Sequence, residues 1–324
     1  MTFLASTKPI LMIKLPPRFS SPMTFGVFAP SGVADQERLK RGIACLESKG
    51  HRVIVAPETY AQWRYFAGTD EQRLAAFHRL VADPGVDVMI MARGGYGWSR
   101  LLRHIDWNAV AASGKAFVGF SDFTAFSLGA LAKANVVTFA GPGIAIDFGT
   151  IGPEPSLKED RDFMEAGFWP VISGEAHSTG PLAAPHAYPP QDIQGPLWGS
   201  NLSVLTHLVG TPYFPQVEGG ILFLEEIGEQ PYAIERMLFQ LYHARVLEKQ
   251  KAIVLADFTD CVPAADRYPY SMEEAIDTLR VLAPCPVLTG LPFGHVARKL
   301  TLPFGATARL VIGPGSYSLE FPAR

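Results

Sequence analysis

The stretch Phe25-Gly26-Val27-Phe28-Ala29-Pro30-Ser31-Gly32 decides the fold class of the N-terminal half of this 324-residue chain. Its first five residues form an apolar run typical of a short buried strand, and Pro30-Ser31-Gly32 ends that strand. Apolar residues then recur at helical spacing from Asp35 to Lys49, and Arg52 to Ala56 is the next apolar run. Strand, helix and strand in this order predict a βαβ unit with two parallel strands.

The same alternation continues to residue 140. Further apolar strands are predicted at 86–92, 116–120 and 136–140, with helices at 71–83 and 122–134. Apolar strands that alternate with amphipathic helices are typical of a parallel sheet covered on both faces. We therefore expect an α/β fold whose N-terminal domain is a doubly wound, mainly parallel, Rossmann-like sheet.

The pattern changes after this half. Pro and Gly are dense between 141 and 196, where only 158–168 has helical periodicity, and the later segments predict a smaller, mixed α/β domain that ends in a hairpin. The predicted organisation is a poorly structured extension at 1–23, an N-terminal domain at 24–145, an interdomain connection at 146–195 and a C-terminal domain at 196–324.

Composition excludes several classes of protein. The chain is longer than one hydrophobic core usually takes in, so two domains are expected. Lys plus Arg (28) nearly balances Asp plus Glu (31), and no basic run could follow a nucleic acid backbone. No apolar run reaches the roughly 18 residues that span a bilayer. Cys45, Cys261 and Cys285 lie far apart and in no metal-ligand spacing, which favours reduced thiols in a cytoplasmic protein without a zinc site.

Ser121 is the strongest candidate for chemistry. It stands in Val118-Gly119-Phe120-Ser121-Asp122-Phe123-Thr124, between a predicted buried strand and a predicted helix. Such a turn can project a nucleophilic hydroxyl beside the free N–H groups of the helix start. The alternative is that Ser121 only caps the helix, since serine is a preferred cap and Phe123 replaces the second glycine of GxSxG.

A nucleophilic serine needs a base and an acid from elsewhere in the chain. His295 lies in the glycine-flanked turn Gly290-Leu291-Pro292-Phe293-Gly294-His295, as a general base or as a structural histidine. Glu225 and Glu226 end an apolar strand, and alternation makes them point to opposite faces, so one is expected to face a buried partner. The alternative is that both are solvated loop residues.

A glycine-rich turn follows the strand at 86–92. The sequence Ala92-Arg93-Gly94-Gly95-Tyr96-Gly97-Trp98 has no Walker A or GxGxxG spacing, so we interpret Gly94 and Gly95 as an oxyanion-binding turn beside Ser121, or as an ordinary strand-to-helix turn. In either case Tyr96 and Trp98 are expected to form a wall.

Taken together, these segments resemble the LD-carboxypeptidase family of serine peptidases, which also contains the microcin C self-immunity peptidases. The similarity runs from Phe25 to the C-terminus, although Ser200 stands where a second glycine is more usual. Six blocks carry it: Val27-Phe28-Ala29-Pro30-Ser31-Gly32, Ala92-Arg93-Gly94-Gly95-Tyr96-Gly97, Gly119-Phe120-Ser121-Asp122, Trp198-Gly199-Ser200-Asn201-Leu202-Ser203, Leu224-Glu225-Glu226-Ile227-Gly228-Glu229 and Pro292-Phe293-Gly294-His295.

The resemblance implies a triad of Ser121 as nucleophile, Glu225 as orienting carboxylate and His295 as base. The first domain then brings the serine and the second brings the acid and the base. For the oxyanion we assign the backbone N–H of Asp122 and one N–H from Gly94 or Gly95.

The substrate that the resemblance implies is a cytoplasmic muropeptide tetrapeptide from cell-wall recycling, from which terminal D-alanine is released. No metal or organic cofactor is needed, and a homodimer is expected. A carboxypeptidase must hold a free carboxylate, for which Arg93, Arg100 and Arg236 are unranked candidates.

Three other interpretations stay open. One keeps the triad in a self-immunity peptidase that cleaves a peptidyl-nucleotide antibiotic, with Trp98 as a stacking face. Another is a non-catalytic two-domain binding protein, which predicts that Ser121, Glu225 and His295 do not touch. A third is an α/β-hydrolase, whose order of serine, acid and histidine agrees.

Overall fold

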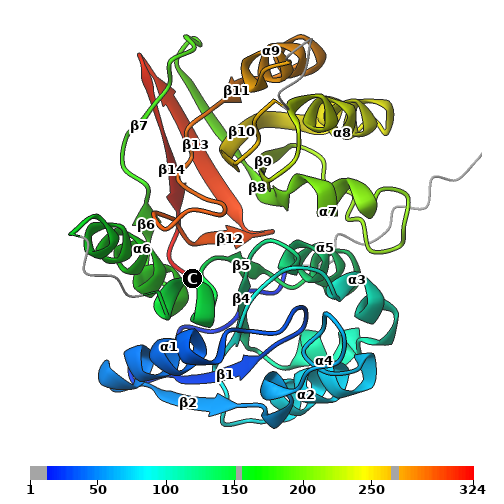
Figure 1. Cartoon of the computed structure of the whole chain (residues 1–324). Coiled ribbons are helices and arrows are strands. Elements are labelled where there is room, and N and C mark those ends of the chain that lie inside the picture. Colours follow the sequence, from blue (N-terminus) through cyan, green and yellow to red (C-terminus); the bar gives the residue numbers. More distant parts are fainter. Residues whose placement is uncertain (1–12, 151–154, 264–269) are drawn as a thin grey trace, which may run out of the picture.

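The computed structural model describes residues 13–150, 155–263 and 270–324 and contains two β-sheets (Figure 1). The first sheet has the strand order β12-β5-β4-β3-β1-β2. Its first five strands in sequence are parallel, and β12 from the C-terminal half pairs antiparallel with β5 at one edge. The bounds are β1 (Thr24–Phe28), β2 (Arg52–Val55), β3 (Val88–Met91), β4 (Ala116–Gly119), β5 (Thr138–Ala140) and β12 (Leu302–Phe304).

Helices cover both faces of this sheet, because its strands are apolar on both sides. On one face, Val27 and Ile90 pack against α1, η3 and α6; on the other, Phe28 and Met91 pack against the helices α2 to α5. The doubly wound α/β architecture expected from the sequence is thereby confirmed. These helices are α1 (Gln36–Ser48), α2 (Asp70–Ala82), α3 (Trp98–Leu101), α4 (Trp107–Ala112), α5 (Phe123–Ala134), the π-helical turn η3 (Ile144–Phe148) and α6 (Pro155–Ser173), with the short 3-10 turns η1 (Pro57–Tyr60) and η2 (Leu102–His104).

The second sheet is mixed, with the order β11-β10-β9-β8-β13-β14-β6 and with β7 paired to β14. Its parallel part, β8 to β11, is covered by helices, whereas β13 and β14 form the expected terminal hairpin. The bounds are β6 (His177–Ser178), β7 (Leu182–Ala183), β8 (Gln191–Asn201), α7 (Leu202–His207), β9 (Gly220–Ile227), α8 (Pro231–His243), η4 (Leu247–Lys249), β10 (Gln250–Thr259), α9 (Met272–Leu282), β11 (Val287–Leu288), β13 (Thr307–Gly313) and β14 (Ser316–Phe321).

The predicted connection at 146–195 contains more regular structure than its composition indicates. Helix α6 continues to Ser173 through Pro170, and β8 begins at Gln191 in the middle of the second sheet. Residues 191–196 of β8 pair with β13, and residues 197–201 pair with β9. Pro196, which has no N–H for a ladder, therefore lies where the strand changes partner.

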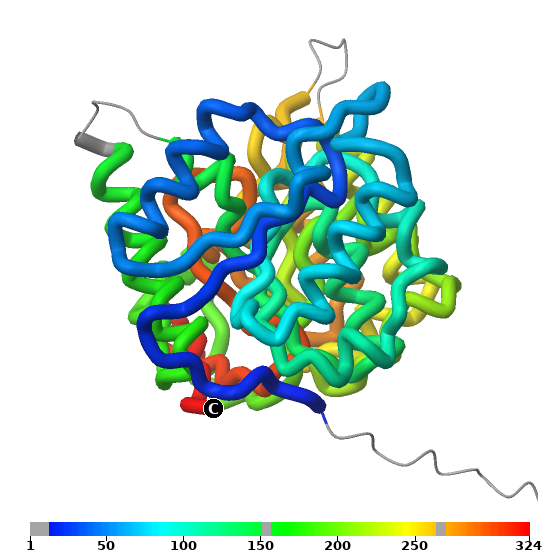
Figure 2. Tube along the Cα trace, turned by 90° about the horizontal axis from the view of Figure 1, so that it is seen from below, coloured from blue at the N-terminus to red at the C-terminus, as the bar shows by residue number. Residues whose placement is uncertain are grey.

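The extension predicted to be poorly structured lies partly outside the described residues, at 1–12. From residue 13 the chain runs along the first sheet, where Lys14 N donates to Asn135 O (2.6 Å) and Val137 N donates to Lys14 O (2.9 Å). Figure 2 shows this first described segment beside the C-terminus, where Arg324 donates to Pro16 O. Residues 13–22 thus follow the surface of the fold with few contacts, because most of their side chains are exposed and only Lys14 forms a β-bridge.

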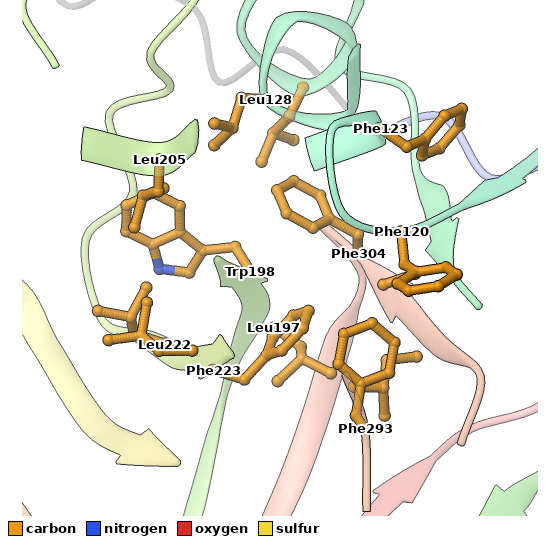
Figure 3. Close-up of a cluster of buried hydrophobic side chains, with 14 of the residues drawn as sticks. Phe120, Phe123, Leu128, Leu197, Trp198, Leu205, Leu222, Phe223, Phe293 and Phe304 are labelled. Atoms are coloured by element: carbon orange, nitrogen blue, oxygen red, sulfur yellow. The ribbon is translucent and has the colours of Figure 1, made fainter. Parts of the chain in front are cut away.

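The two halves share one hydrophobic core (Figure 3). Phe120, Phe123 and Leu128 from the first half meet Trp198, Phe223, Phe293 and other buried side chains from the second half, all at most 2% exposed. Because a large apolar interface opposes relative motion of two domains, it fixes the segment before α5 against the turn that carries His295.

Candidate active site

Ser121 lies at a sharp turn between β4 and α5. Its φ of +62° is rare for a residue other than glycine, and the N-cap position of α5 belongs to Asp122, which makes no side-chain cap bond. A β-carbon at Gly119 would lie 2.6 Å from the Phe123 ring, so the turn needs glycine there. The interpretation of Ser121 as a helix cap is therefore wrong, because its hydroxyl points elsewhere.

The Ser121 hydroxyl faces an imidazole from the other half of the chain. Ser121 Oγ lies 2.9 Å from His295 Nε2, and His295 Nδ1 lies 2.9 Å from Glu225 Oε2. The His295 ring packs edge-on against Phe120 with 5.2 Å between ring centroids. Gly294 has a φ of +133°, and a β-carbon there would lie 3.3 Å from Glu225 Oε2, so glycine lets this turn approach the carboxylate.

The two glutamates at the end of β9 point to opposite sides, as alternation predicts. Glu226 accepts hydrogen bonds from Asn201 Nδ2, Ser203 N and Ile227 N, and burial raises the pKa of its carboxyl. Glu225 and Glu226 are 0% and 2% exposed, so the interpretation as solvated loop residues is wrong. Glu225 is the residue that reaches the imidazole.

The glycine-rich turn lies directly against the serine. A β-carbon at Gly94 would lie 3.0 Å from Ser121 Cβ and 3.2 Å from Ser121 Oγ. The buried Asp122 carboxylate accepts hydrogen bonds from Ser31 Oγ (2.6 Å) and Trp98 N (3.0 Å), and burial raises the pKa of Asp122 to about 6. Asp122 therefore ties together the loops that follow β1, β3 and β4.

Trp98 does not form the expected wall. Its side chain is 0% exposed and packs among Phe77, Phe123 and Phe126, with ring centroids 5.4, 5.9 and 4.7 Å away. The turn at Gly97 directs the indole inward, under the helices, so it offers no face to a ligand. Trp98 is thus a core residue.

A cavity of about 520 Å³ opens beside Ser121 and His295. Of the predicted binding residues, Arg93 lines it. Arg100 instead pairs with Asp70, Arg236 lies exposed on α8, and the half-exposed Tyr96 packs against Phe66. The lining comprises Arg93, Gly94, Gly95, Phe120, Ser121, Ile146, Asp147, Thr150, Leu157, Arg161, Met164, Ile227, His295, Val296, Ala297 and Lys299.

Three charged lining residues were not found from the sequence. Lys299 Nζ lies 2.8 Å from Asp147 Oδ1, with both side chains at most 5% exposed, and 3.6 Å from the centre of the Phe120 ring. Arg161 pairs with Glu165 at 3.0 Å. Asp147 and Arg161 fall in the predicted connection, where no motif marks them, whereas the position of Lys299 four residues after His295 was an available signal.

The described ranges contain neither a candidate metal site nor a candidate membrane span. No group of three or more His, Cys, Asp or Glu side chains there is arranged to hold a metal ion. Likewise, none of the helices in 13–150, 155–263 and 270–324 has the length and apolar character needed to cross a bilayer.

A hydroxyl, an imidazole and a buried carboxylate joined in one hydrogen-bonded chain at a cavity are typical of hydrolases that attack acyl groups. Fold and site together thus define a hydrolase of α/β architecture, whose serine follows a strand of the first sheet and whose acid ends a strand of the second.

Comparison with known proteins identifies the family. The N-terminal domain of LD-carboxypeptidases matches residues 25–141, and their C-terminal domain matches residues 194–310. The chain therefore belongs to the LD-carboxypeptidase family, as the sequence motifs indicate, and the protein is a peptidase.

Three named relatives are similar in sequence to this chain over most of their own length. A probable murein peptide carboxypeptidase of Bacillus subtilis is 32% identical over 89% of this chain and 88% of the relative. The crystal structure of muramoyltetrapeptide carboxypeptidase from Oxalobacter formigenes is 36% identical, with a TM-score of 0.84 over 93% of this chain and 99% of that chain. The microcin C7 self-immunity protein MccF of Escherichia coli is 28% identical over 91% of this chain and 93% of the relative.

Proposed function

We propose that this protein is a serine carboxypeptidase that hydrolyses an LD peptide bond and releases terminal D-alanine from muropeptide tetrapeptides during cell-wall recycling. The observation that carries the proposal is the hydrogen-bonded chain from Ser121 through His295 to Glu225, with both distances at 2.9 Å. The relatives named for murein peptides support this choice of substrate.

Acylation starts at Ser121. As Ser121 Oγ attacks the scissile carbonyl, His295 Nε2 takes the hydroxyl proton. Glu225 accepts a hydrogen bond from His295 Nδ1–H and stabilises the imidazolium. The oxyanion accepts hydrogen bonds from the N–H of Asp122 and from one N–H of Gly94 or Gly95. Loss of one such donor typically lowers kcat by about 10²–10³.

The end of acylation and the deacylation that follows both move a proton through His295. His295 gives its proton to the nitrogen of the departing D-alanine, the C–N bond breaks, and the acyl group stays on Ser121. His295 then takes a proton from water, which attacks the ester and releases the shortened peptide as a free acid. Ser121 recovers its proton from His295, so the cycle needs no cofactor.

Two alternatives are weighed against this proposal. Similarity to MccF keeps a self-immunity peptidase as the second candidate. The stacking face expected of Trp98 in that candidate is absent, because Trp98 is buried. The non-catalytic binding protein predicts separated side chains, which the contacts of His295 contradict.

We also propose a cytoplasmic location, which the proposed recycling substrate supports. We propose further that the protein acts as a homodimer. Light scattering on the purified chain tests the dimer, because a mass near the 35.3 kDa of one chain would exclude it.

The decisive experiment compares two substrates. The purified protein should release D-alanine from a muropeptide tetrapeptide, and Ser121→Ala should abolish this while leaving the circular dichroism spectrum unchanged. Cleavage of an acyl-sulfamoyl adenylate in preference to the tetrapeptide would favour the self-immunity function, and turnover by Ser121→Ala would refute the nucleophile.

A further inference from the structure

We propose that Arg93 and Tyr65 together bind the C-terminal carboxylate of the peptide, and that this contact restricts the enzyme to substrates with a free terminus. The inference rests on the proposed carboxypeptidase function and deepens it. It names the two side chains that distinguish a terminal residue from one inside a longer chain.

Arg93 is the cavity cation that lacks a counter-ion within the described parts of the chain. Arg161 is paired with Glu165, and Lys299 is paired with Asp147. The Arg93 guanidinium instead makes one hydrogen bond, from Nη1 to the backbone oxygen of Val33 at 3.1 Å. A half-buried guanidinium whose remaining donors face a cavity is suited to bind a carboxylate with two parallel hydrogen bonds.

Gly95 lets the Tyr65 hydroxyl lie close to this guanidinium. A β-carbon at Gly95 would lie 2.2 Å from Tyr65 Oη and 3.7 Å from Arg93 Nη2, so the hydroxyl occupies the place that a side chain at this residue would take. Gly95 has a φ of +112°, is exposed and lines the cavity together with Arg93, so the hydroxyl that packs on it lies at the cavity wall. On a second side, a β-carbon at Gly32 would lie 3.4 Å from Tyr65 Oη and 3.5 Å from Arg93 Cζ. Arg93 and Tyr65 thus border one small cradle.

Tyr65 is held by its backbone and its ring, whereas its hydroxyl is available. Its backbone oxygen accepts a hydrogen bond from Val33 N, the same residue whose carbonyl holds Arg93. Its ring packs edge-on against Phe66, with 5.4 Å between the centroids. Among the described residues, no side chain or backbone group hydrogen-bonds the hydroxyl of this half-exposed tyrosine. A phenol O–H can therefore add a third donor to the two from Arg93.

The position of the cradle fits the leaving residue. Arg93 directly precedes Gly94 in the chain. A β-carbon at Gly94 would lie 3.2 Å from Ser121 Oγ, so the glycine leaves room for the nucleophile. In a carboxypeptidase substrate, the terminal carboxylate is separated from the attacked carbonyl by one amide nitrogen and one α-carbon. The cation that binds it must lie close to the nucleophile, and Arg93 lines the same cavity as Ser121 and His295.

The test uses two peptides that differ in one group: an L,D-tetrapeptide with a free terminal carboxylate, and the same peptide ending in D-alaninamide. We expect the unaltered protein to prefer the free acid by roughly 100-fold in kcat/KM, since hydrogen bonds to a charged group are worth more than those to a neutral one. Arg93→Met should lower kcat/KM for the acid by about that factor and lower the amide value far less, so that the preference is lost. Tyr65→Phe should lower the acid value by roughly tenfold.

Arg100→Met is the matched control. Arg100 lies on the same side of the first domain but pairs with Asp70 outside the cavity, so its loss should leave the ratio of acid to amide unchanged. Labelling of Ser121 by a fluorophosphonate probe reports whether the triad of each variant is intact.

Different failures have different meanings. No preference for the acid in the unaltered protein, or an equal loss on both peptides in Arg93→Met, would overturn the carboxylate site while leaving the peptidase function in place. Hydrolysis of neither peptide by the unaltered protein would overturn the proposed function and this inference with it.

Discussion

Replacement of Glu225 by glutamine separates the charge of this residue from its shape. Glu225 is fully buried, its Oε2 lies 2.9 Å from His295 Nδ1, and its Oε1 has no hydrogen-bond partner among the described residues. Because no described group bonds Oε1, the introduced glutamine can turn either its amide oxygen or its amide nitrogen toward the imidazole.

Both orientations of the amide lower the rate. With the oxygen toward Nδ1, the imidazole keeps its tautomer but the imidazolium loses the charge that stabilises it. With the nitrogen toward Nδ1, the imidazole must place its proton on Nε2, where it can no longer accept the proton of Ser121. Removing the charge of a triad carboxylate typically lowers kcat by about 10⁴, so we expect Glu225→Gln to reduce kcat by about 10³–10⁴.

Glu226→Gln is the matched control, because the residue is adjacent, equally buried and identical in type. Its carboxylate accepts three hydrogen bonds, from Asn201 Nδ2, Ser203 N and Ile227 N. An amide nitrogen in place of one oxygen would face an N–H group, which we expect to cost about 1–3 kcal/mol of unfolding free energy. The triad distances do not depend on this carboxylate, so kcat should fall far less.

The assay measures D-alanine release and urea unfolding for both variants. We expect Glu225→Gln to lose rate with little change in stability, and Glu226→Gln to lose stability with most of its rate retained. The reverse ranking of the two rates would show that the acid is Glu226, which would refute the reasoning.

Three further predictions concern stability. Lys299→Met should lower the unfolding free energy by about 3–5 kcal/mol, because it leaves Asp147 buried without its partner. The double variant Asp147→Asn/Lys299→Met should lose clearly less than the sum of the single losses, and additive losses would exclude the pairing. Ser200→Gly should raise the unfolding free energy by about 1 kcal/mol, because Ser200 has a φ of +80° and a buried hydroxyl without a partner in the described chain; destabilisation in urea would contradict this. Since burial raises the pKa of Asp122 to about 6, folding favours its protonated form, and its contribution to stability should fall by about 2 kcal/mol as pH rises from 4 to 7. Asp122→Asn should remove this part of the pH dependence, and equal slopes in urea titrations of both proteins would argue against it.

The sequence predicted the N-terminal sheet well because its strands are buried on both faces. Runs such as 86–92 and 116–120 are continuously apolar, which is the pattern of a strand covered on both sides, and the hairpin at 307–313 and 316–321 alternates clearly. Strand β8 was missed because Gly195 and Pro196 interrupt its strand pattern. Contacts that the sequence does not show explain why each of these residues stands there. A β-carbon at Gly195 would lie 2.2 Å from Gly219 O, and Pro196 falls where β8 exchanges β13 for β9.

The site was predicted in part. Alternation along β9 showed that only one of Glu225 and Glu226 could face the histidine, but it could not say which, and the motif of the family gave the register. Trp98 was placed wrongly because a single tryptophan after a glycine turn is compatible with either side of that turn. Its direction depends on the space between Phe77 and Phe126, which is a tertiary property.

Asp147 and Arg161 show the limit of local reasoning. They reach the cavity from η3 and α6, in a stretch whose composition resembles a linker. No spacing connects them to Ser121, since only the packing of η3 and α6 on the first sheet brings them there.

The central claim is that Ser121 is a nucleophile activated by His295, and covalent labelling tests it most directly. The protein is incubated with a fluorophosphonate probe and digested, and the modified peptide is identified by mass spectrometry. We expect one adduct, on Ser121, which is absent in Ser121→Ala and strongly reduced in His295→Ala. An adduct on another residue, or an unlabelled Ser121 in a protein that still releases D-alanine, would contradict the account.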